Sequence, residues 1–515
     1  MSSSNNWQPK LGDKFVRRPR IRLHLRRVLG VPGLFSTAYG DIGSSIYYAL
    51  GIVVVVASGA TPVSLAIAGI FFVFTALSYA EGTAMLPEAG GSASFARHGF
   101  NDMVGFIAGW ALMFGYVVTI SISAFTIPSY LGYFWEPLKI SPTFGTAAAM
   151  AIVLILIVIN VFGIKESSLL NLFLTILDMG TQILLVLLAL LFLFNPAVFV
   201  ERIVNYWPST PNLIFGVAIA AIAFTGIETI SQMAEETRRP QVRSPRALIL
   251  TTVAVLAISG GLSVSAFSAM TPAEMASEWA KDPIAGIAHA LSFAIVPGQL
   301  AAEWFSEPGA QIVVAWVLGM VRALLPLLIA LLAATILFVA TNAGLMGISR
   351  LAFSLGRFQM IPPAMSRVHS KFKTPFIAII LFGLVAVLLQ VPGFFMPNLF
   401  EHLGGLYAFG SMLSFALAHL AIIALRVRKP ELPRPFRLGW NIKFKEREVP
   451  VTALLGLLGT SVVWVVVVIM QPYSRWVGLA WMAVGIGVYY LFRWRKGISL
   501  RQAADKPEMS VWDIR

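Results

Sequence analysis

The feature that most constrains this chain is the recurrence of apolar runs, each about 20 residues long, which is the length at which an α-helix crosses the hydrocarbon core of a bilayer. Such runs place the chain among polytopic membrane proteins and not among soluble ones. Their boundaries divide the 515-residue chain into twelve predicted spans at 33–58, 62–86, 103–134, 143–163, 167–195, 211–236, 246–270, 324–349, 374–391, 398–425, 449–470 and 475–493. The sequence therefore predicts an all-α membrane protein with the lipid bilayer as its surroundings.

Composition excludes several classes of protein. Only 12% of the residues are charged, whereas soluble domains carry about a quarter. The chain has no cysteine, so disulfides and cysteine metal sites are impossible. We find no Walker A sequence and no credible nucleophile–base pair. The sequence thus predicts neither an enzyme nor an ATP-driven machine, and no cofactor.

The distribution of basic residues predicts the orientation. Of the 38 Lys and Arg residues, 33 fall in segments that the twelve spans place on one side, and positive loops face the cytoplasm. We therefore expect both termini in the cytoplasm and the protein in the plasma membrane. The net charge of +14 is then a topology signal, and no nucleic-acid partner is expected. The predicted domains are a basic tail, 1–32, a membrane domain, 33–495, and a second tail, 496–515.

One long external segment, 271–323, separates the predicted seventh and eighth spans. It contains helical apolar periodicity near 284–293 and 312–320. Two interpretations stay open for it: helices that cap a path through the membrane domain, or an ordinary structured loop.

Two spans contain residues that a continuous helix would avoid. Span 1 holds glycines, serines and an aspartate between Ala38 and Tyr48, and span 6 reads Phe224-Thr225-Gly226-Ile227-Glu228. Irregular backbone at membrane depth is tolerated where it lines a cavity or is buried in protein. Matching interruptions in two halves of a chain are typical of inverted-repeat transporters. We expect a five-span repeat at 33–195, a second at 211–425, and two further helices within 449–493.

Ionisable residues inside spans are costly and usually functional. Asp41 and Glu228 lie in the two interruptions, and Asp178 lies midway along span 5. We expect all three to serve proton coupling, although Asp178 could instead pair with a hydroxyl such as that of Thr175 or Thr181. Glu81 could sit at the membrane interface. For His419, a hydrogen-bonded packing role is favoured over a proton relay.

The order of motifs resembles the amino acid–polyamine–organocation (APC) superfamily over roughly residues 30–495. The resemblance rests on Leu86–Ser92, Phe224–Glu228, Ala234–Pro240 and Asn342–Arg357. It implies a LeuT-type 5+5 inverted repeat with discontinuous helices 1 and 6, plus helices 11 and 12. It also implies secondary transport, often coupled to protons.

Within that superfamily, span 1 is similar to the KUP-type potassium importers, on residues 39–45. That resemblance implies an oxygen-lined site, in which the regular spacing of Tyr116, Thr119 and Ser123 gives one hydroxyl face. The implied substrate or ion site comprises Asp41, Gly43, Ser44, Ser45, Tyr48, Tyr116, Thr119, Ser123, Thr225, Gly226, Glu228 and Tyr407. A potassium ion would bind at Asp41, Tyr48, Thr119, Ser123 and Thr225.

The expected function is proton-coupled uptake of a small solute or monovalent cation. Potassium is favoured, because an ionised Asp41 would repel a substrate carboxylate at the first interruption. The alternative is an amino acid or polyamine permease, working by proton symport or by exchange. The motifs after span 2 and around spans 6 and 8 are more typical of amino acid permeases.

Overall fold

The computed structural model describes residues 27, 29–163, 168–444 and 447–501. The predicted tails, 1–32 and 496–515, fall mostly outside these residues. In the described part, eleven stretches are long and apolar enough to cross a membrane, and a bent helix pair makes a twelfth candidate. The first stretch, Val31–Met85, contains the predicted spans 1 and 2. All twelve predicted spans are therefore present as helices, and the chain is a polytopic membrane protein.

The first half of the bundle contains the predicted spans 1 to 5. Its transmembrane elements are α1 (Val31–Ile42), the 3₁₀ turn η1 (Gly43–Ser45), α2 (Ile46–Ala57), α3 (Thr61–Met85), α5 (Asp102–Leu131), α7 (Pro142–Phe162) and α8 (Ser168–Phe192). Shorter elements connect them: the 3₁₀ turn η2 (Ser58–Ala60), α4 (Ser92–Gly99), α6 (Pro137–Ile140) and α9 (Pro196–Asn205). Helix α7 begins with Pro142 and ends at Phe162, and Gly163 caps it in the left-handed region, at φ 70°, as glycine commonly does after a helix.

The second half repeats this pattern. Span 6 consists of α10 (Thr210–Ala220), the 3₁₀ turn η3 (Ala221–Phe224) and α11 (Glu228–Gln232), and after it come η4 (Ala234–Glu236), α12 (Pro240–Ala269), α16 (Pro308–Arg357), α17 (Phe376–Gln390) and α18 (Leu399–Arg428). The connecting elements are α13 (Pro272–Glu278), α14 (Pro283–Ala294), α15 (Pro297–Trp304), η5 (Pro363–Ser366) and η6 (Val391–Phe394). Helices α19 (Val451–Met470) and α20 (Pro472–Lys496) follow the two repeats.

The two interrupted spans cross at the centre of the bundle. Helix α2 packs against α10, α1 packs against α11 and α12, and η1 contacts η3. The second half of span 1 therefore lies beside the first half of span 6, and the first half of span 1 beside the second half of span 6, which is the arrangement of an inverted repeat. Helix α5 packs against both α16 and α18 and completes the centre. The fold is the expected LeuT-type bundle.

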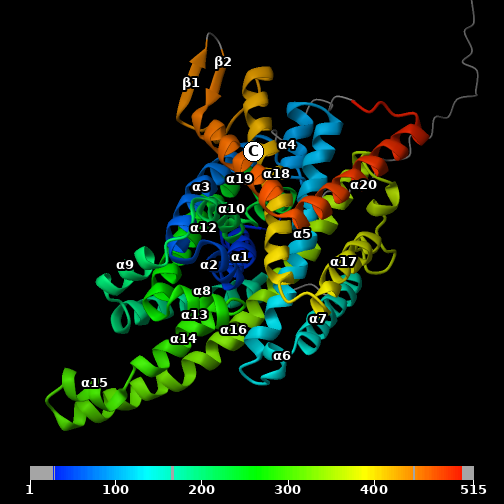
Figure 1. The fold of residues 1–515 in the computed structure, drawn as a ribbon. Coiled ribbons are helices and arrows are strands. Elements are labelled where there is room, and N and C mark those ends of the chain that lie inside the picture. Colours follow the sequence, from blue (N-terminus) through cyan, green and yellow to red (C-terminus); the bar gives the residue numbers. More distant parts are fainter. Residues whose placement is uncertain (1–26, 28, 164–167, 445–446, 502–515) are drawn as a thin grey trace, which may run out of the picture.

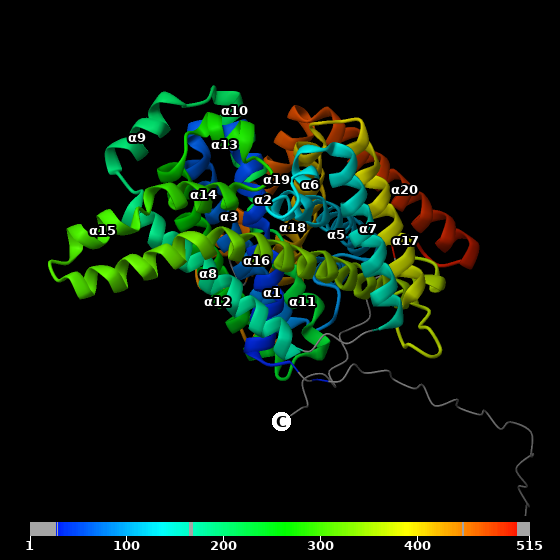
Figure 2. The same cartoon turned by 90° about the horizontal axis from the view of Figure 1, so that it is seen from below.

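The two ends of the bundle differ. One end carries a two-stranded antiparallel hairpin, β1 (Asn441–Phe444) and β2 (Arg447–Pro450), and we call it the hairpin end (Figure 1). The opposite end carries α6, α9 and α13 (Figure 1). Seen from that side, α15 and the first half of α16 extend sideways from the bundle (Figure 2).

Helix α16 is longer than expected. The sequence predicts a span at 324–349, but the helix runs over 50 residues, from Pro308 to Arg357. Pro326 lies inside it, where a proline is tolerated in membrane helices because other groups satisfy the freed backbone carbonyl. Part of the predicted external segment is thus continuous with span 8.

Candidate functional site

The interruption of span 6 is a true break in the helix. Thr225 is extended, at ψ 154°, and Gly226 has φ +111°, a conformation that favours glycine. A Cβ atom at position 226 would lie 2.9 Å from Cγ of Asp41. Only glycine therefore fits here, both because of its backbone angle and because the Asp41 carboxyl packs directly against it.

The interruption of span 1 is milder than that of span 6. Gly43 keeps a right-handed conformation, at φ −64° and ψ −27°, and the chain passes through one 3₁₀ turn. The Ser44 hydroxyl donates to the Asp41 carbonyl oxygen over 2.8 Å, with the Ser45 hydroxyl 3.5 Å away. Because serine hydroxyls satisfy local carbonyls in this way, the segment tightens without unwinding. Of the two predicted discontinuities, the one in span 1 is a tightened helical turn, and only the one in span 6 leaves the helical conformation.

Asp41 and Glu228 meet at the break and are buried. Each is only 2% exposed. The Thr229 hydroxyl donates to Oδ2 of Asp41 over 2.5 Å, and the Gly226 N–H donates to Oε2 of Glu228 over 3.1 Å. Oδ1 of Asp41 has no hydrogen-bond partner. Among the residues that the structure describes, neither carboxylate forms an ion pair.

This arrangement favours a cationic guest. The two carboxylates are near enough to repel each other when both are ionised. A buried pair of like charges is relieved when one group takes a proton or when a cation binds between them. The site can therefore hold a proton, an ammonium group or a metal cation, and its chemistry alone does not distinguish these.

Hydroxyl groups surround the two carboxylates. Tyr48 shares a hydrogen bond with Ser45 over 2.9 Å, and its hydroxyl lies near Ser123 on α5. Tyr116 interacts electrostatically with both carboxylates, and its hydroxyl is buried without a partner. The fold thus brings together the interruption residues and the hydroxyl residues that the sequence singles out, which include Thr119 and Tyr407. Ser123 Oγ is likewise without a partner.

Asp178 belongs to a different network. The Tyr47 hydroxyl donates to its Oδ1 over 2.6 Å, and Nε2 of Gln182 donates to its Oδ2 over 2.7 Å. The hydroxyl partner is therefore Tyr47. Thr175 instead donates to the Ser36 carbonyl, and Thr181 to that of Leu177, so the suggested pairing with either threonine is wrong. Asp178 braces span 1 against span 5 and has both oxygens satisfied.

Sequence reasoning did not foresee that three of the family-like motifs meet at the hairpin end. Oε1 of Glu235 accepts from the Ala89 N–H over 3.1 Å and from Arg357 over 3.0 Å. Arg350 pairs with Glu236 over 3.0 Å. These residues come from the segments after spans 2, 6 and 8, so their ion pairs close the bundle at this end. Their charged composition was the available signal, but pairing across 122 residues is not encoded in local spacing.

Glu88 lies beside this cluster, between α3 and α4, outside the spans. The Ser94 hydroxyl donates to its Oε2 over 2.8 Å, and Nε2 of His98 lies 3.2 Å from its Oε1. Burial raises the pKa of Glu88, but the contacts with His98 and Ser94 and the nearby Arg97 outweigh it and lower that pKa to about 2. Glu88 is therefore ionised throughout the physiological range.

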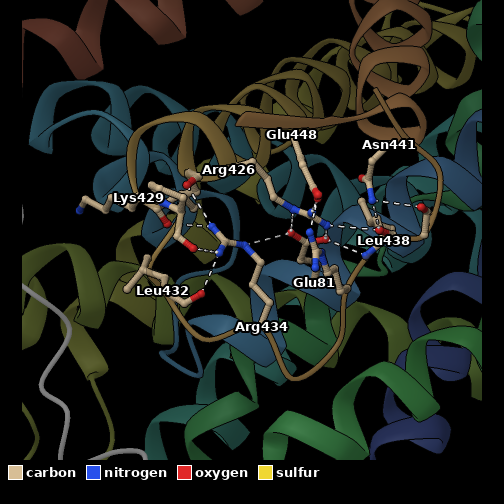
Figure 3. Close-up of polar contacts among 12 residues, drawn as sticks. Glu81, Arg426, Lys429, Leu432, Arg434, Leu438, Asn441 and Glu448 are labelled. Atoms are coloured by element: carbon tan, nitrogen blue, oxygen red, sulfur yellow. Dashed lines mark hydrogen bonds and ion pairs between the residues drawn. The ribbon is translucent and has the colours of Figure 1, made fainter. Parts of the chain in front are cut away.

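Glu81 is also at the hairpin end and is paired (Figure 3). Arg426 of α18 donates two hydrogen bonds of 2.6 Å to its two oxygens, and the Leu438 N–H adds one of 2.9 Å. Nε of Arg434 lies 3.7 Å from Glu81, and Glu448 of β2 lies 3.5 Å from Arg426. The Glu81 side chain is fully buried, so it does not sit at a solvated interface. This cluster ties span 2 to span 10 and to the hairpin.

His419, inside span 10, is a hydrogen-bonded packing residue, which is the role that the sequence favours over a proton relay. Its ring nitrogens lie 3.1 Å from the Thr75 hydroxyl and 2.9 Å from that of Ser78. No cluster of three or more His, Asp or Glu side chains that could hold a metal ion occurs in the described ranges.

Comparison with known proteins assigns the family. The family model described as "Amino acid permease" matches residues 29–491. The branched-chain amino acid permease BcaP of Bacillus subtilis is 28% identical over 503 residues, covering 93% of this chain and 95% of the relative. The methylthioribose transporter of the same organism is 25% identical, covering 88% of this chain and 90% of the relative. The human large neutral amino acids transporter small subunit 2 is 25% identical, covering 82% of this chain and 72% of the relative.

These relatives support the resemblance to the APC superfamily but not the resemblance of span 1 to the KUP-type potassium importers. They agree with the APC resemblance, whereas none of these three is described as a potassium importer. Because the family model spans nearly all of the membrane domain, the chain belongs to the amino acid permease family.

Proposed function

We propose that this protein is a secondary-active permease that carries a neutral amino acid into the cell together with a proton. The observation that carries the proposal is the buried Asp41–Glu228 pair at the break in span 6, without an ion-pair partner in the described residues. Such a pair needs positive charge from outside the protein. The ammonium group of an amino acid and a proton supply it together.

The proposed binding mode follows from the local geometry. The substrate ammonium group would lie near Oδ1 of Asp41, which is buried and has no hydrogen-bond partner. The Asp41 carboxyl faces Gly226 and Thr229 on span 6. Ser44 and Ser45, on the following 3₁₀ turn, contact the backbone carbonyl of Asp41 and not its carboxyl. A substrate carboxylate could bind near these serines without direct contact with Asp41. Glu228 would take the proton.

The substrate class is proposed from the relatives. Two of them are described as transporters of branched-chain or large neutral amino acids. We therefore propose an amino acid with an apolar side chain. Methylthioribose, named for a third relative, is a competing small solute.

Potassium is the second candidate. An all-oxygen cage can replace the hydration shell of a potassium ion. The hydroxyl oxygens proposed for such a cage, together with Asp41, are those of Tyr48, Thr119, Ser123 and Thr225. The relatives favour the amino acid over this candidate, although the geometry admits both.

We further propose that the hairpin end faces the cytoplasm. It carries Arg350, Arg357, Arg426, Arg434 and Arg437, and basic segments stay on the cytoplasmic side. The opposite end, with α6, α9 and α13, would then face outward, and the protein would reside in the plasma membrane.

The test is a flux measurement in proteoliposomes with an inward pH gradient. We expect accumulation of labelled leucine that collapses with a protonophore, and no Rb⁺ flux. Asp41→Asn and Glu228→Gln should each abolish pH-driven accumulation. Glu278→Gln, at an exposed position on α13, is the matched control and should leave accumulation intact. Rb⁺ flux without leucine flux would favour potassium and overturn the amino acid proposal.

A further inference from the structure

The segment between α14 and the centre of α16 forms an arm that leaves the bundle. It comprises residues 295–322, which are α15 and the outer part of α16 with their connections. Figure 2 shows that it projects sideways, away from the crossing of spans 1 and 6. Its base is fixed, because Ile284, Ile287 and Leu291 of α14 are completely buried. The arm itself has little protein around it.

The length of α16 does not match the membrane. Fifty residues of α-helix extend about 75 Å, whereas the hydrocarbon core is about 30 Å thick. An upright α16 would hold its outer half well beyond the bilayer, in water. Soluble segments of that kind are polar, so the composition of the outer half decides where it lies.

The outer half is as apolar as a span. Between Asp282 and Arg322 the only charged residues are Glu303 and Glu307, both at the turn between α15 and α16. Helices α14 and α15 together are long and apolar enough for a span, but they are bent by 62° relative to each other. A broken or re-entrant segment has this character.

Six of the exposed apolar side chains of α16 form one stripe. Its members are spaced by three or four residues and so share a helix face, and they are Val313, Val317, Met320, Leu324, Leu328 and Leu331. The last three lie in the predicted span, 324–349, where this face meets acyl chains. The stripe continues without a polar interruption from there into the arm, and Ile312 and Trp316 beside it are 72% and 65% exposed.

We infer that the arm is a re-entrant anchor that lies in the outer leaflet and whose partner is the lipid bilayer. The stripe on α16 rests among acyl chains, continuous with the lipid-facing side of span 8. Trp304 and Trp316 provide the amphipathic rings that gather at headgroup depth. Glu303 and Glu307 at the turn point to the headgroup layer, and Arg322 extends its charged end to the same layer. This assigns part of the external segment 271–323 to the membrane and not to a cap over the transport path.

The absence of cysteine makes the test direct. Single cysteines are introduced into the full chain at Val313→Cys and, separately, Ile312→Cys, and each is spin-labelled in lipid nanodiscs. Leu331→Cys on the spanning part of the same stripe serves as the lipid control. Ser277→Cys, exposed on α13, serves as the water control. Each variant is used only if its unfolding midpoint matches that of the parent chain.

Collision with oxygen, which concentrates in lipid, is compared with collision with a water-soluble nickel chelate. We expect the labels at 312 and 313 to match Leu331→Cys, with oxygen collisions at least three times those of nickel. Ser277→Cys should show the reverse ratio. High nickel access at 312 and 313 would place the arm in water and overturn the inference. Low access to both reagents would show a protein surface over the arm, such as a second copy, and would overturn it equally.

Discussion

Two regions of this protein bury carboxylates, and they differ in whether those carboxylates have a cationic partner. At the hairpin end, Glu81 is met by two hydrogen bonds from Arg426 and one from the Leu438 N–H. At the centre, Asp41 and Glu228 receive single hydrogen bonds and, within the described residues, no cation. A buried ion pair links the helices that carry its two charges. A buried pair of acids without a cation has an excess of negative charge, which a bound proton or cationic substrate can neutralise. The difference separates a structural carboxylate from a functional one.

The largest stability effect should come from breaking the hairpin-end pair. Glu81→Gln leaves Arg426, which is 3% exposed, with only its longer 3.5 Å contact to Glu448. Removing one partner of a buried pair costs about 3–5 kcal/mol of unfolding free energy. Detergent-induced unfolding measures this loss. Glu278→Gln, at an exposed position on α13, is the matched control and should change the free energy by less than about 0.5 kcal/mol.

A second variant checks the cause of that loss. Glu81→Leu combined with Arg426→Met removes both charges and should destabilise less than Glu81→Gln alone. If the double variant is the worse of the two, desolvated charge is not the reason for the loss.

The central acids should show the opposite pattern. Asp41→Asn keeps an acceptor for the Thr229 hydroxyl and removes one of two mutually repelling charges. We expect pH-driven leucine accumulation to fall at least about 100-fold, which corresponds to about 2.7 kcal/mol. The unfolding free energy should stay level or rise. A loss of stability as large as that of Glu81→Gln would erase the contrast between the two regions.

The break in span 6 can be tested without changing any charge. Gly226→Ala adds a Cβ atom 2.9 Å from Cγ of Asp41 at φ +111°. Displacing the carboxyl should reduce accumulation by about ten-fold or more, because small misplacements of binding groups are costly. Gly260→Ala in α12 meets no atom within 4 Å, and it should transport normally. Equal activity of both variants would count against the role of the Asp41 position.

The pH dependence of stability should reveal the ionised acid at the hairpin end. The pKa of Glu88 is lowered to about 2, against about 4.3 for a free glutamate. A lowered acid pKa stabilises the fold above the unfolded value, and this contribution is lost as pH falls from about 4.3 toward 2. Wild-type protein should therefore lose about 1 kcal/mol more unfolding free energy between pH 5 and pH 3 than Glu88→Gln. Identical slopes would contradict the assignment.

Asp178 should give the smallest effect. Both of its oxygens are hydrogen-bonded, and an asparagine can keep the bond from Tyr47. We expect Asp178→Asn to reduce leucine uptake by only about two- to five-fold, the size of one weakened hydrogen bond. If this variant uncouples leucine from protons, coupling extends to Asp178, as the sequence analysis expected.

The sequence predicted the local features well. Apolar runs gave the spans, and glycine beside a carboxylate marked the break at Gly226. It did not reveal that the Ser44 and Ser45 hydroxyls would keep span 1 helical, since the same residues favour turns. Partners across long separations were also hidden: Arg426 lies 345 residues after Glu81. Composition alone did not show that α16 continues outward to Pro308.

The most direct test of the central claim measures proton movement driven by substrate. A leucine gradient is imposed on proteoliposomes that contain a pH-sensitive dye, and leucine counterflow is recorded in parallel. We predict that leucine entry acidifies the lumen of wild-type vesicles. Glu228→Gln should retain leucine counterflow but cause no acidification. Acidification by Glu228→Gln at the wild-type ratio of protons to leucine would contradict the claim that this buried, unpaired carboxylate carries the coupled proton.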